Sequence, residues 1–297
     1  MRIITRGDLD GLVASVLLST MEDVEKIELV HPQHITDSLF DVMEGDILAK
    51  MPYHPRCHMW FSHRQVTESN ARPPESFRGS HVIARSVSRV IYDHYNSPEL
   101  ERFLPLVDGA DRFESASLTQ EEVTDPRGII LLGFLIDPRT SFGPFRVFFK
   151  SLVQRLRSMP MEDVLREPDV AEREELYRER ESSFRDALLR HSRVEENVVI
   201  TDFRQFDNVP IGNRFMVYTL FPQCNVSVRL QWGPEKRFVA ATLGRSIFNL
   251  SSTTNIGNLC SDYGGGGHEG AGSSPLEPEA ADEKVREMVA VLNEGVD

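Results

Sequence analysis

The chain has 297 residues, of which 40% are hydrophobic and 27% are charged, and its net charge is −13 at pH 7. At roughly 100–200 residues per domain, this length predicts about two domains. The composition is that of an ordinary globular protein and excludes disordered, collagenous and coiled-coil classes. So acidic a chain offers no broad basic face for duplex DNA, and it needs local cations or a metal to bind an anionic ligand.

The three cysteines, Cys57, Cys224 and Cys260, are scattered and form no C-x-x-C pair. This usage is typical of a reducing compartment and excludes a disulfide framework or a structural zinc site. The first residues are charged and form no signal-peptide core, and no apolar run is long enough to span a membrane. We therefore expect a soluble, cytoplasmic protein with no membrane partner.

The N-terminal half alternates short strands and helices, which predicts an α/β domain with a parallel sheet. The elements expected there are strands over 2–5, 26–31, 46–51 and 81–83 and helices over 12–21 and 84–95. A charged, amphipathic helical segment follows, and beyond it the pattern becomes β. The elements expected in this last part are strands over 197–203, 214–220, 226–232 and 238–242 and a helix over 281–293. We expect an α/β domain over 1–150, a helical connector over 151–195 and a smaller α+β domain over 196–297.

Asp8 and Asp10 follow the first expected strand, at the sheet edge where open α/β proteins bind their ligands. Two carboxylates so close together repel each other unless a cation lies between them, and a divalent metal is the common solution. The alternative is turn chemistry, in which Asp10 caps the following helix.

Two further segments carry potential metal ligands. His54, His58 and His63 lie in a histidine-rich stretch, but their spacing is not that of a compact zinc site. Asp108 and Asp111 follow an apolar run, where solvated loop carboxylates are the alternative to ligands.

The strongest local signal is a glycine run near the C-terminus: six of the nine residues from Gly264 to Gly272 are glycine. Backbone without side chains lets consecutive N–H groups approach an anion, and His268 adds a donor. A flexible linker is the alternative. We interpret the run as a phosphate-binding loop formed by Gly265, Gly266, Gly267 and His268.

Taken together, these segments resemble the DHH phosphoesterase superfamily over nearly the whole chain. Residues 5–11 are similar to its motif I, 60–64 to its Asp-His-His motif, 107–111 to motif IV and 264–268 to its G-G-G-H loop. The resemblance implies a DHH domain with two divalent metals, typically Mn²⁺, and a DHH-associated C-terminal domain with a glycine-rich substrate-binding loop. Three shorter segments are most similar to the exopolyphosphatase-related branch: 137–140, 212–215 and 255–257.

The metal-binding positions depart from the family pattern. Arg6 stands at the motif I histidine position, Lys50 stands at the motif II aspartate position, and the triplet itself reads Ser62-His63-Arg64. These replacements predict an eroded two-metal site and a degenerate Asp-His-His motif.

The ligands that the resemblance leaves are Asp8, Asp10, His63 and Asp108. They imply at most one weakly bound Mn²⁺ or Mg²⁺. His63 and Arg64 are the candidates for a catalytic role.

Arg6, Lys50 and Arg64 would add three positive charges around the carboxylates and could hold a phosphate electrostatically. They cannot acidify a bound water as a metal does. We therefore expect a protein that binds a phosphorylated small molecule, a nucleotide or a short single-stranded nucleic acid in the interdomain cleft, with little or no hydrolysis. The alternative is an active one-metal phosphoesterase that hydrolyses polyphosphate, an oligonucleotide or another phosphate ester.

Overall fold

The computed structural model describes residues 1–65, 72–136 and 144–296. The expected signature segment 137–140 lies outside them. The chain folds into two compact units, one of Met1–Leu118 with Pro126–Glu175 and one of Thr119–Asp125 with Leu176–Asp297. The boundary falls within helix α9 (Pro168–His191), so the two units share the helical segment expected over 151–195.

The first unit is built on a five-stranded, wholly parallel sheet with the strand order β2-β1-β3-β4-β5. Its strands are β1 (Arg2–Thr5), β2 (Lys26–Leu29), β3 (Asp46–Ala49), β4 (Met59–Ser62) and β5 (Gly79–His81). Strands β1, β3 and β4 are almost entirely buried, as expected of a parallel sheet covered on both faces.

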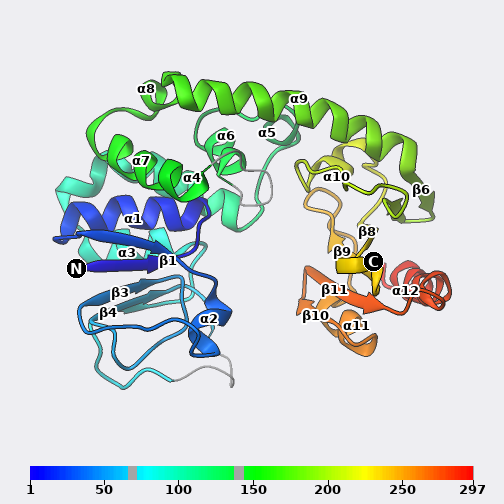
Figure 1. Ribbon diagram of the computed structural model, residues 1–297, viewed down its shortest axis with the longest axis horizontal. Coiled ribbons are helices and arrows are strands. Elements are labelled where there is room, and N and C mark those ends of the chain that lie inside the picture. The colour runs from blue at the N-terminus through cyan, green and yellow to red at the C-terminus, as the bar shows by residue number, and fades with distance from the viewer. Residues whose placement is uncertain (66–71, 137–143, 297) are drawn as a thin grey trace. The chain divides into compact units, whose positions relative to one another are not determined.

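Most helices of the first unit lie on one face of this sheet, and the short helix α2 (Pro32–Thr36) packs on the other (Figure 1). The helices of the first unit are α1 (Leu9–Met21), α2 (Pro32–Thr36), α3 (Val87–Tyr95), α4 (Leu104–Glu114), α6 (Gly128–Leu135), α7 (Phe145–Ser158) and α8 (Met161–Arg166), with a 3₁₀ turn over Pro98–Phe103. Helix α1 is buried over nearly all its length because it lies between the sheet and helices α3, α4 and α7. On the other face, Ile35 of α2 packs against Ile4, Leu48 and Trp60 of the strands.

The second unit contains a six-stranded sheet with the order β10-β11-β9-β8-β7-β6, in which only β7 and β8 run parallel. Its strands are β6 (Ser192–Glu195), β7 (Val198–Asp202), β8 (Val226–Trp232), β9 (Val239–Arg245), β10 (Gly266–His268) and β11 (Ala271–Leu276). Its other elements are α5 (Gln120–Thr124), α10 (Met216–Leu220), a 3₁₀ turn over Pro234–Lys236, α11 (Ile256–Asp262) and α12 (Ala281–Glu294).

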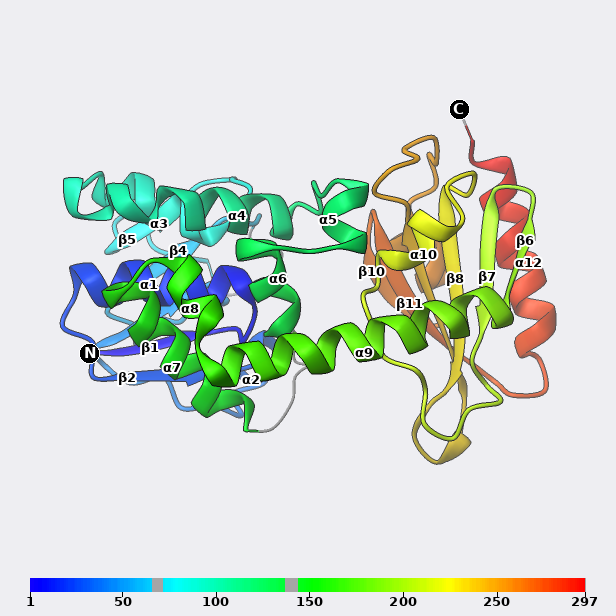
Figure 2. The same cartoon turned by 90° about the horizontal axis from the view of Figure 1, so that it is seen from above.

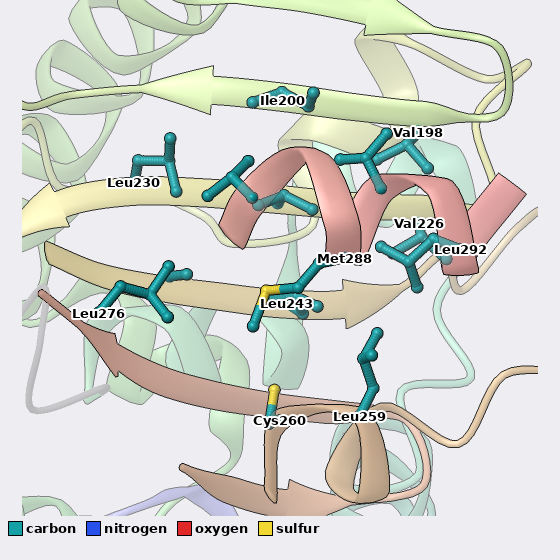
Figure 3. Close-up of a cluster of buried hydrophobic side chains, with 14 of the residues drawn as sticks. Val198, Ile200, Val226, Leu230, Leu243, Leu259, Cys260, Leu276, Met288 and Leu292 are labelled. Carbon is teal, nitrogen blue, oxygen red and sulfur yellow. The ribbon is translucent and has the colours of Figure 1, made fainter. Parts of the chain in front are cut away.

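The core of the second unit lies between this sheet and helices α11 and α12. Strands β8 and β9 alternate buried and partly exposed residues, the two-residue period of a strand with one buried face. Leu292 of α12 lies beside Val226 of β8, and Met288 of α12 lies beside Leu243 of β9, so α12 runs along the sheet (Figures 2 and 3).

The α/β class expected from the sequence is confirmed, but three local assignments change. Residues 214–220 were expected as a strand, yet Met216–Leu220 is helix α10. Its residues are apolar all round, so its sequence carries no helical period that would distinguish it from a strand. Residues 107–111 were expected in a loop but lie in α4, and the whole of Met59–Ser62 is strand β4. No helix within the described ranges is long and apolar enough to cross a membrane.

Candidate active site

Three neighbouring strands of the first sheet deliver the candidate residues to one edge. Strands β1, β3 and β4 are adjacent and parallel, so their carboxyl ends meet, and ligands bind at this edge in open α/β sheets. Asp8 follows β1, Lys50 follows β3, and His63 follows β4. Chain topology therefore brings together residues that lie more than forty positions apart in sequence.

Asp8 caps helix α1. One carboxylate oxygen, Oδ1, accepts a hydrogen bond from Gly11 N at 3.0 Å, while the other, Oδ2, lies 3.0 Å from Lys50 Nζ and 3.4 Å from Arg6 Nε. A side chain at Gly11 would meet the Arg6 carbonyl oxygen at 2.1 Å, so the tight turn between β1 and α1 requires glycine there. The turn thus directs one Asp8 oxygen into its own helix and the other toward the cations.

Asp10 lies buried at the N-terminus of α3. Its Oδ1 accepts hydrogen bonds from Ser88 N (2.9 Å) and Ser88 Oγ (2.7 Å), and its Oδ2 accepts one from Val87 N (3.1 Å). The expectation that Asp10 would cap the following helix is wrong, because Asp8 takes that role. Free N–H groups and the helix dipole of α3 instead stabilise the Asp10 carboxylate.

Lys50 provides the central cation. Its Nζ lies 2.6 Å from Glu114 Oε2, 3.0 Å from Asp8 Oδ2 and 3.4 Å from Asp10 Oδ2, and its side chain is only 2% exposed. Its φ of +63° lies in the left-handed region, which among non-glycine residues asparagine and aspartate adopt most readily. This backbone therefore suits the aspartate expected from the family pattern better than it suits lysine.

The attraction between these charges shifts the pKa values of Lys50 and Glu114. Burial lowers the pKa of the Lys50 ammonium, but the attraction of Asp8, Asp10 and Glu114 outweighs burial and raises the pKa overall. Burial raises the pKa of the Glu114 carboxyl, but the hydrogen bond to His63 and the charges of Lys50 and Arg64 outweigh it and hold that pKa well below its usual range. Lys50 and Glu114 are therefore both charged at neutral pH.

Arg64 connects His63 to the same carboxylate. Its Nη2 lies 2.5 Å from Glu114 Oε1, and its Nε lies 3.3 Å from His63 Nε2. We call the seven side chains that meet at this edge the Lys50 cluster: Arg6, Asp8, Asp10, Lys50, His63, Arg64 and Glu114. Its three carboxylates are matched by three fixed cations, so the charges balance without an added ion.

Asp10, His63 and Glu114 are a possible metal site, since each offers a ligand atom and these atoms lie within 4.8 Å of one another. All three are already engaged: Lys50 contacts both carboxylates, and Arg64 contacts His63 and Glu114. The arrangement has the geometry for one ion but not the charge, because a divalent cation would lie against the Lys50 ammonium. It does not fit a pair of ions.

Helix α4 changes the expected acidic set. Asp108 lies on the exposed side of α4 and pairs with Arg89 Nη2 at 2.5 Å, while buried Asp111 binds Arg89 and Ser86 Oγ. Neither joins the Lys50 cluster among the described contacts. Glu114, which the sequence analysis did not single out, stands beside His63 instead. Asp108, Asp111 and Glu114 are spaced by three residues. This spacing places side chains on one side of the chain only in a helix, whereas the sequence predicts a loop here.

The glycine run forms the β10–β11 hairpin in the second unit, and most of its glycines have a packing reason. A side-chain Cβ would meet Ser273 O at 2.0 Å from Gly265 and Ala271 O at 2.2 Å from Gly267. Gly264 has a φ of +74°. Gly266 differs from these three, since a Cβ there would meet nothing within 4 Å and its φ is not positive. The fold therefore explains the neighbours of Gly266 but not Gly266 itself.

His268 ends β10 with an exposed side chain. Its Nδ1 accepts a hydrogen bond from Gly270 N at 3.2 Å. In the neutral ring the proton then resides on Nε2, which leaves an N–H donor on the outer side of the imidazole. An open backbone stretch at Gly266 next to this donor has the chemistry of an anion site.

Comparison with known proteins gives structural neighbours of this fold. PggH from Vibrio cholerae, a pGpG-specific phosphodiesterase, is 34% identical, and the match covers 99% of each chain with a TM-score of 0.87. A DHH domain from a member of a ribosomal-protein family is 14% identical over 100% of this chain and 87% of its own, with a TM-score of 0.57. RecJ from Thermus thermophilus, in complex with Mn²⁺, is 13% identical with a TM-score of 0.57, and the match covers 100% of this chain and 52% of RecJ.

No protein-family model and no curated protein matches the sequence. The fold and the site define a protein with an acidic centre at the edge of a parallel sheet and a second α+β unit that carries a glycine hairpin. With its similarity to PggH over 99% of its length, the chain belongs to the DHH phosphoesterase superfamily. The resemblance seen in the sequence is thereby confirmed for the superfamily.

Proposed function

We propose that this protein binds a short phosphorylated nucleotide at the Lys50 cluster and hydrolyses it slowly or not at all. One observation supports this most strongly: the buried Lys50 ammonium lies between Asp8, Asp10 and Glu114 and contacts all three carboxylates. A fixed ammonium can attract a phosphate but cannot acidify a bound water as a divalent metal does.

Arg6 and Arg64 supply the cations that could reach a ligand. Their side chains are 39% and 62% exposed, and each leans on a carboxylate of the cluster. The carboxylate partners are largely buried and keep other contacts when a guanidinium turns away: Asp8 keeps Gly11 N and Lys50, and Glu114 keeps Lys50. Lys50 would stay in contact with all three carboxylates while the arginines turn to the ligand.

Two findings support a nucleotide as the ligand. PggH, 34% identical over nearly the full chain, is a pGpG-specific phosphodiesterase. The glycine hairpin of the second unit leaves the backbone at Gly266 open and presents His268 beside it. We propose that Gly265, Gly266, Gly267 and His268 contact a phosphate of the ligand through backbone N–H groups and the imidazole.

The test is a calorimetric titration of pGpG into the wild type, Arg64→Ala and a control, Arg56→Ala. Arg56 is also an exposed arginine of the first unit that pairs with a surface carboxylate, Asp41. We expect Arg64→Ala to weaken binding by at least about tenfold, since it removes one charge-assisted contact, and Arg56→Ala to leave binding unchanged. Chromatography of the same mixtures with Mn²⁺ should find pGpG intact. Equal affinities of the two variants would contradict binding at this cluster.

The second candidate function is a one-metal phosphodiesterase. The Asp10–His63–Glu114 group and the activity of PggH favour it. In that case the wild type would degrade pGpG in the presence of Mn²⁺ or Mg²⁺, the products would vanish with EDTA, and Asp10→Asn would abolish turnover. Metal-dependent products from the wild type would replace the first proposal by this one.

A further inference from the structure

The second unit contains a cavity of about 590 Å³ that no part of the proposed function uses. It lies where α9 ends and β6 begins, beside the carboxyl ends of β7 and β8, the parallel pair of this sheet. Strand β6 is one edge of the sheet, and β10, with the glycine hairpin, is the other. The cavity is therefore a separate place in the same unit.

Arginines dominate the charge of this cavity. Arg190, Arg193 and Arg204 line it, and Asp202 is the only acidic residue in its lining. Asp202 is neutralised by Arg204, whose Nη2 lies 2.6 Å from Asp202 Oδ2 and 2.8 Å from Asp282 Oδ1. Each of the three arginines is paired with a carboxylate, so an anion binds here only by replacing the partners of the two most exposed arginines, Arg190 and Arg193.

Arg190 and Arg193 can exchange their present partners for a ligand. Arg190 is 74% exposed and lies 3.8 Å from Asp186, and Arg193 pairs with Glu195 at 2.8 Å on the protein surface. Exposed pairs of this type contribute little to stability. Arg204, held by two carboxylates, has a fixed position, whereas these two arginines can turn toward a phosphate and hold it through two donors each.

His191 adds a neutral donor with a defined orientation. Gln205 Nε2 lies 2.6 Å from His191 Nδ1 and 3.1 Å from the Asp202 carbonyl oxygen. Because a carbonyl can only accept, the nitrogen of the Gln205 amide must face both groups, so His191 Nδ1 accepts as well. The neutral ring therefore carries its proton on Nε2. An edge contact with Phe206, at 4.9 Å between ring centroids, fixes the imidazole.

Trp232, at the end of β8, supplies an aromatic surface to the same cavity. Its indole is only partly buried, with one side packed on the core of the unit. A partly exposed indole offers a planar surface for stacking of a nucleobase. Volumes of 300–1,000 Å³ are typical of sites for small molecules rather than for polymers.

We propose that this cavity is a second binding site, for a nucleoside monophosphate, in which Arg190 and Arg193 hold the phosphate and Trp232 stacks on the base. The arginines provide the charge, His191 provides a further donor, and the cavity has the volume for one nucleotide. The site is independent of the Lys50 cluster, since all of its residues belong to the second unit.

The experiment is a titration of GMP followed by tryptophan fluorescence and by calorimetry, with every protein carrying Arg64→Ala to weaken the proposed first site. The chain has two tryptophans, and Trp60 is only 2% exposed, so quenching by the ligand reports on Trp232. The test variant is Arg190→Glu/Arg193→Glu. The matched control is Arg166→Glu in α8 of the first unit, also an exposed helical arginine that pairs with a carboxylate one turn away.

We expect GMP to quench the fluorescence, the double charge reversal to weaken GMP binding by at least about tenfold, and Arg166→Glu to leave it unchanged. Unchanged affinity in the double variant would overturn the site. Inorganic phosphate that binds as tightly as GMP would overturn recognition of the base. Because the first site is weakened throughout, failure here does not affect the pGpG experiment, and the reverse also holds.

Discussion

The Lys50 cluster and the glycine hairpin are both expected to face phosphate, but they are built differently. The cluster is made of side chains that follow β1, β3 and β4 or lie in α1 and α4. In the hairpin, Gly265 and Gly267 are required because backbone atoms lie within 2.0–2.2 Å of where a Cβ would be. A site made of side chains can therefore lose its metal chemistry while the fold stays intact. A site made of backbone atoms is preserved, because the packing of the hairpin requires the same glycines.

The largest effect should come from removing the central cation. Lys50→Met leaves Asp8, Asp10 and Glu114 buried or partly buried with no ammonium among them. Removing one partner from a buried network of charges costs about 3–5 kcal/mol. We therefore expect the free energy of unfolding to fall by that amount in urea titrations without metal. Lys26→Met, at an exposed lysine paired with Glu28, is the control and should cost under about 1 kcal/mol. A loss below about 1 kcal/mol for Lys50→Met would show that the cluster does not depend on its ammonium.

In the hairpin, substitutions at two adjacent residues, Gly266 and Gly267, should affect ligand binding and stability separately. Gly267→Ala forces a methyl group to within 2.2 Å of Ala271 O, so we expect a loss of about 2–3 kcal/mol in thermal or urea unfolding. The Cβ added by Gly266→Ala meets nothing within 4 Å, so this variant should have the same free energy of unfolding as the wild type. If Gly266 is open for a ligand, its alanine variant should still weaken pGpG binding. A destabilised Gly266→Ala protein would contradict this division between the two glycines.

A smaller effect is expected at Glu181 of α9, a buried carboxyl whose pKa no cation among the described residues lowers. Its Oε1 accepts from Asn213 N at 2.5 Å, and its Oε2 is buried with no partner among the described residues. Burial raises the pKa of Glu181 to about 7, against the weaker opposing effect of the Asn213 N–H group. This carboxyl is the counterpart of Glu114, whose pKa is lowered by neighbouring cations.

The raised pKa of Glu181 fixes the direction of a pH effect. Below its ordinary pKa of 4.5 the carboxyl is neutral in both the folded and the unfolded state. As the pH rises from 4.5 to about 7, the unfolded state loses the proton first, so the free energy of unfolding falls. We expect Glu181→Gln to gain about 1–2 kcal/mol over the wild type between pH 4.5 and pH 8, measured by unfolding at both values. A difference that does not change with pH would refute the buried neutral carboxyl.

The sequence predicted β1 and β3, two of the three strands that carry the Lys50 cluster, but not β4 and not all members of the cluster. Asp8 and Lys50 each follow a short apolar run, and adjacency of parallel strands makes their proximity predictable. Glu114 was not predictable in the same way, because its position depends on Leu104–Glu114 being a helix rather than a loop. For the same reason Asp108 was expected near the metal and instead pairs with Arg89.

For the glycine run, the sequence predicted a binding role for more residues than the structure leaves without a packing reason. Its composition predicted an anion loop, yet the hairpin geometry explains Gly265 and Gly267 without any ligand. Only contacts at a distance in sequence, such as the carbonyl oxygens of Ala271 and Ser273, separate the structural glycines from Gly266. No local pattern contains that information.

The central claim is that Lys50 and its neighbours replace the metals of the superfamily, and Mn²⁺ binding tests it most directly. Metal-free wild type and the variant Lys50→Asn/Ser62→Asp/Arg64→His, which removes two cations and restores the Asp-His-His triplet, would be titrated with Mn²⁺ in a calorimeter. The left-handed backbone at position 50 suits asparagine. We predict less than one Mn²⁺ per chain for the wild type and clearly tighter binding, with more ions, for the variant. Two tightly bound ions in the wild type, or no gain in the variant, would contradict the account.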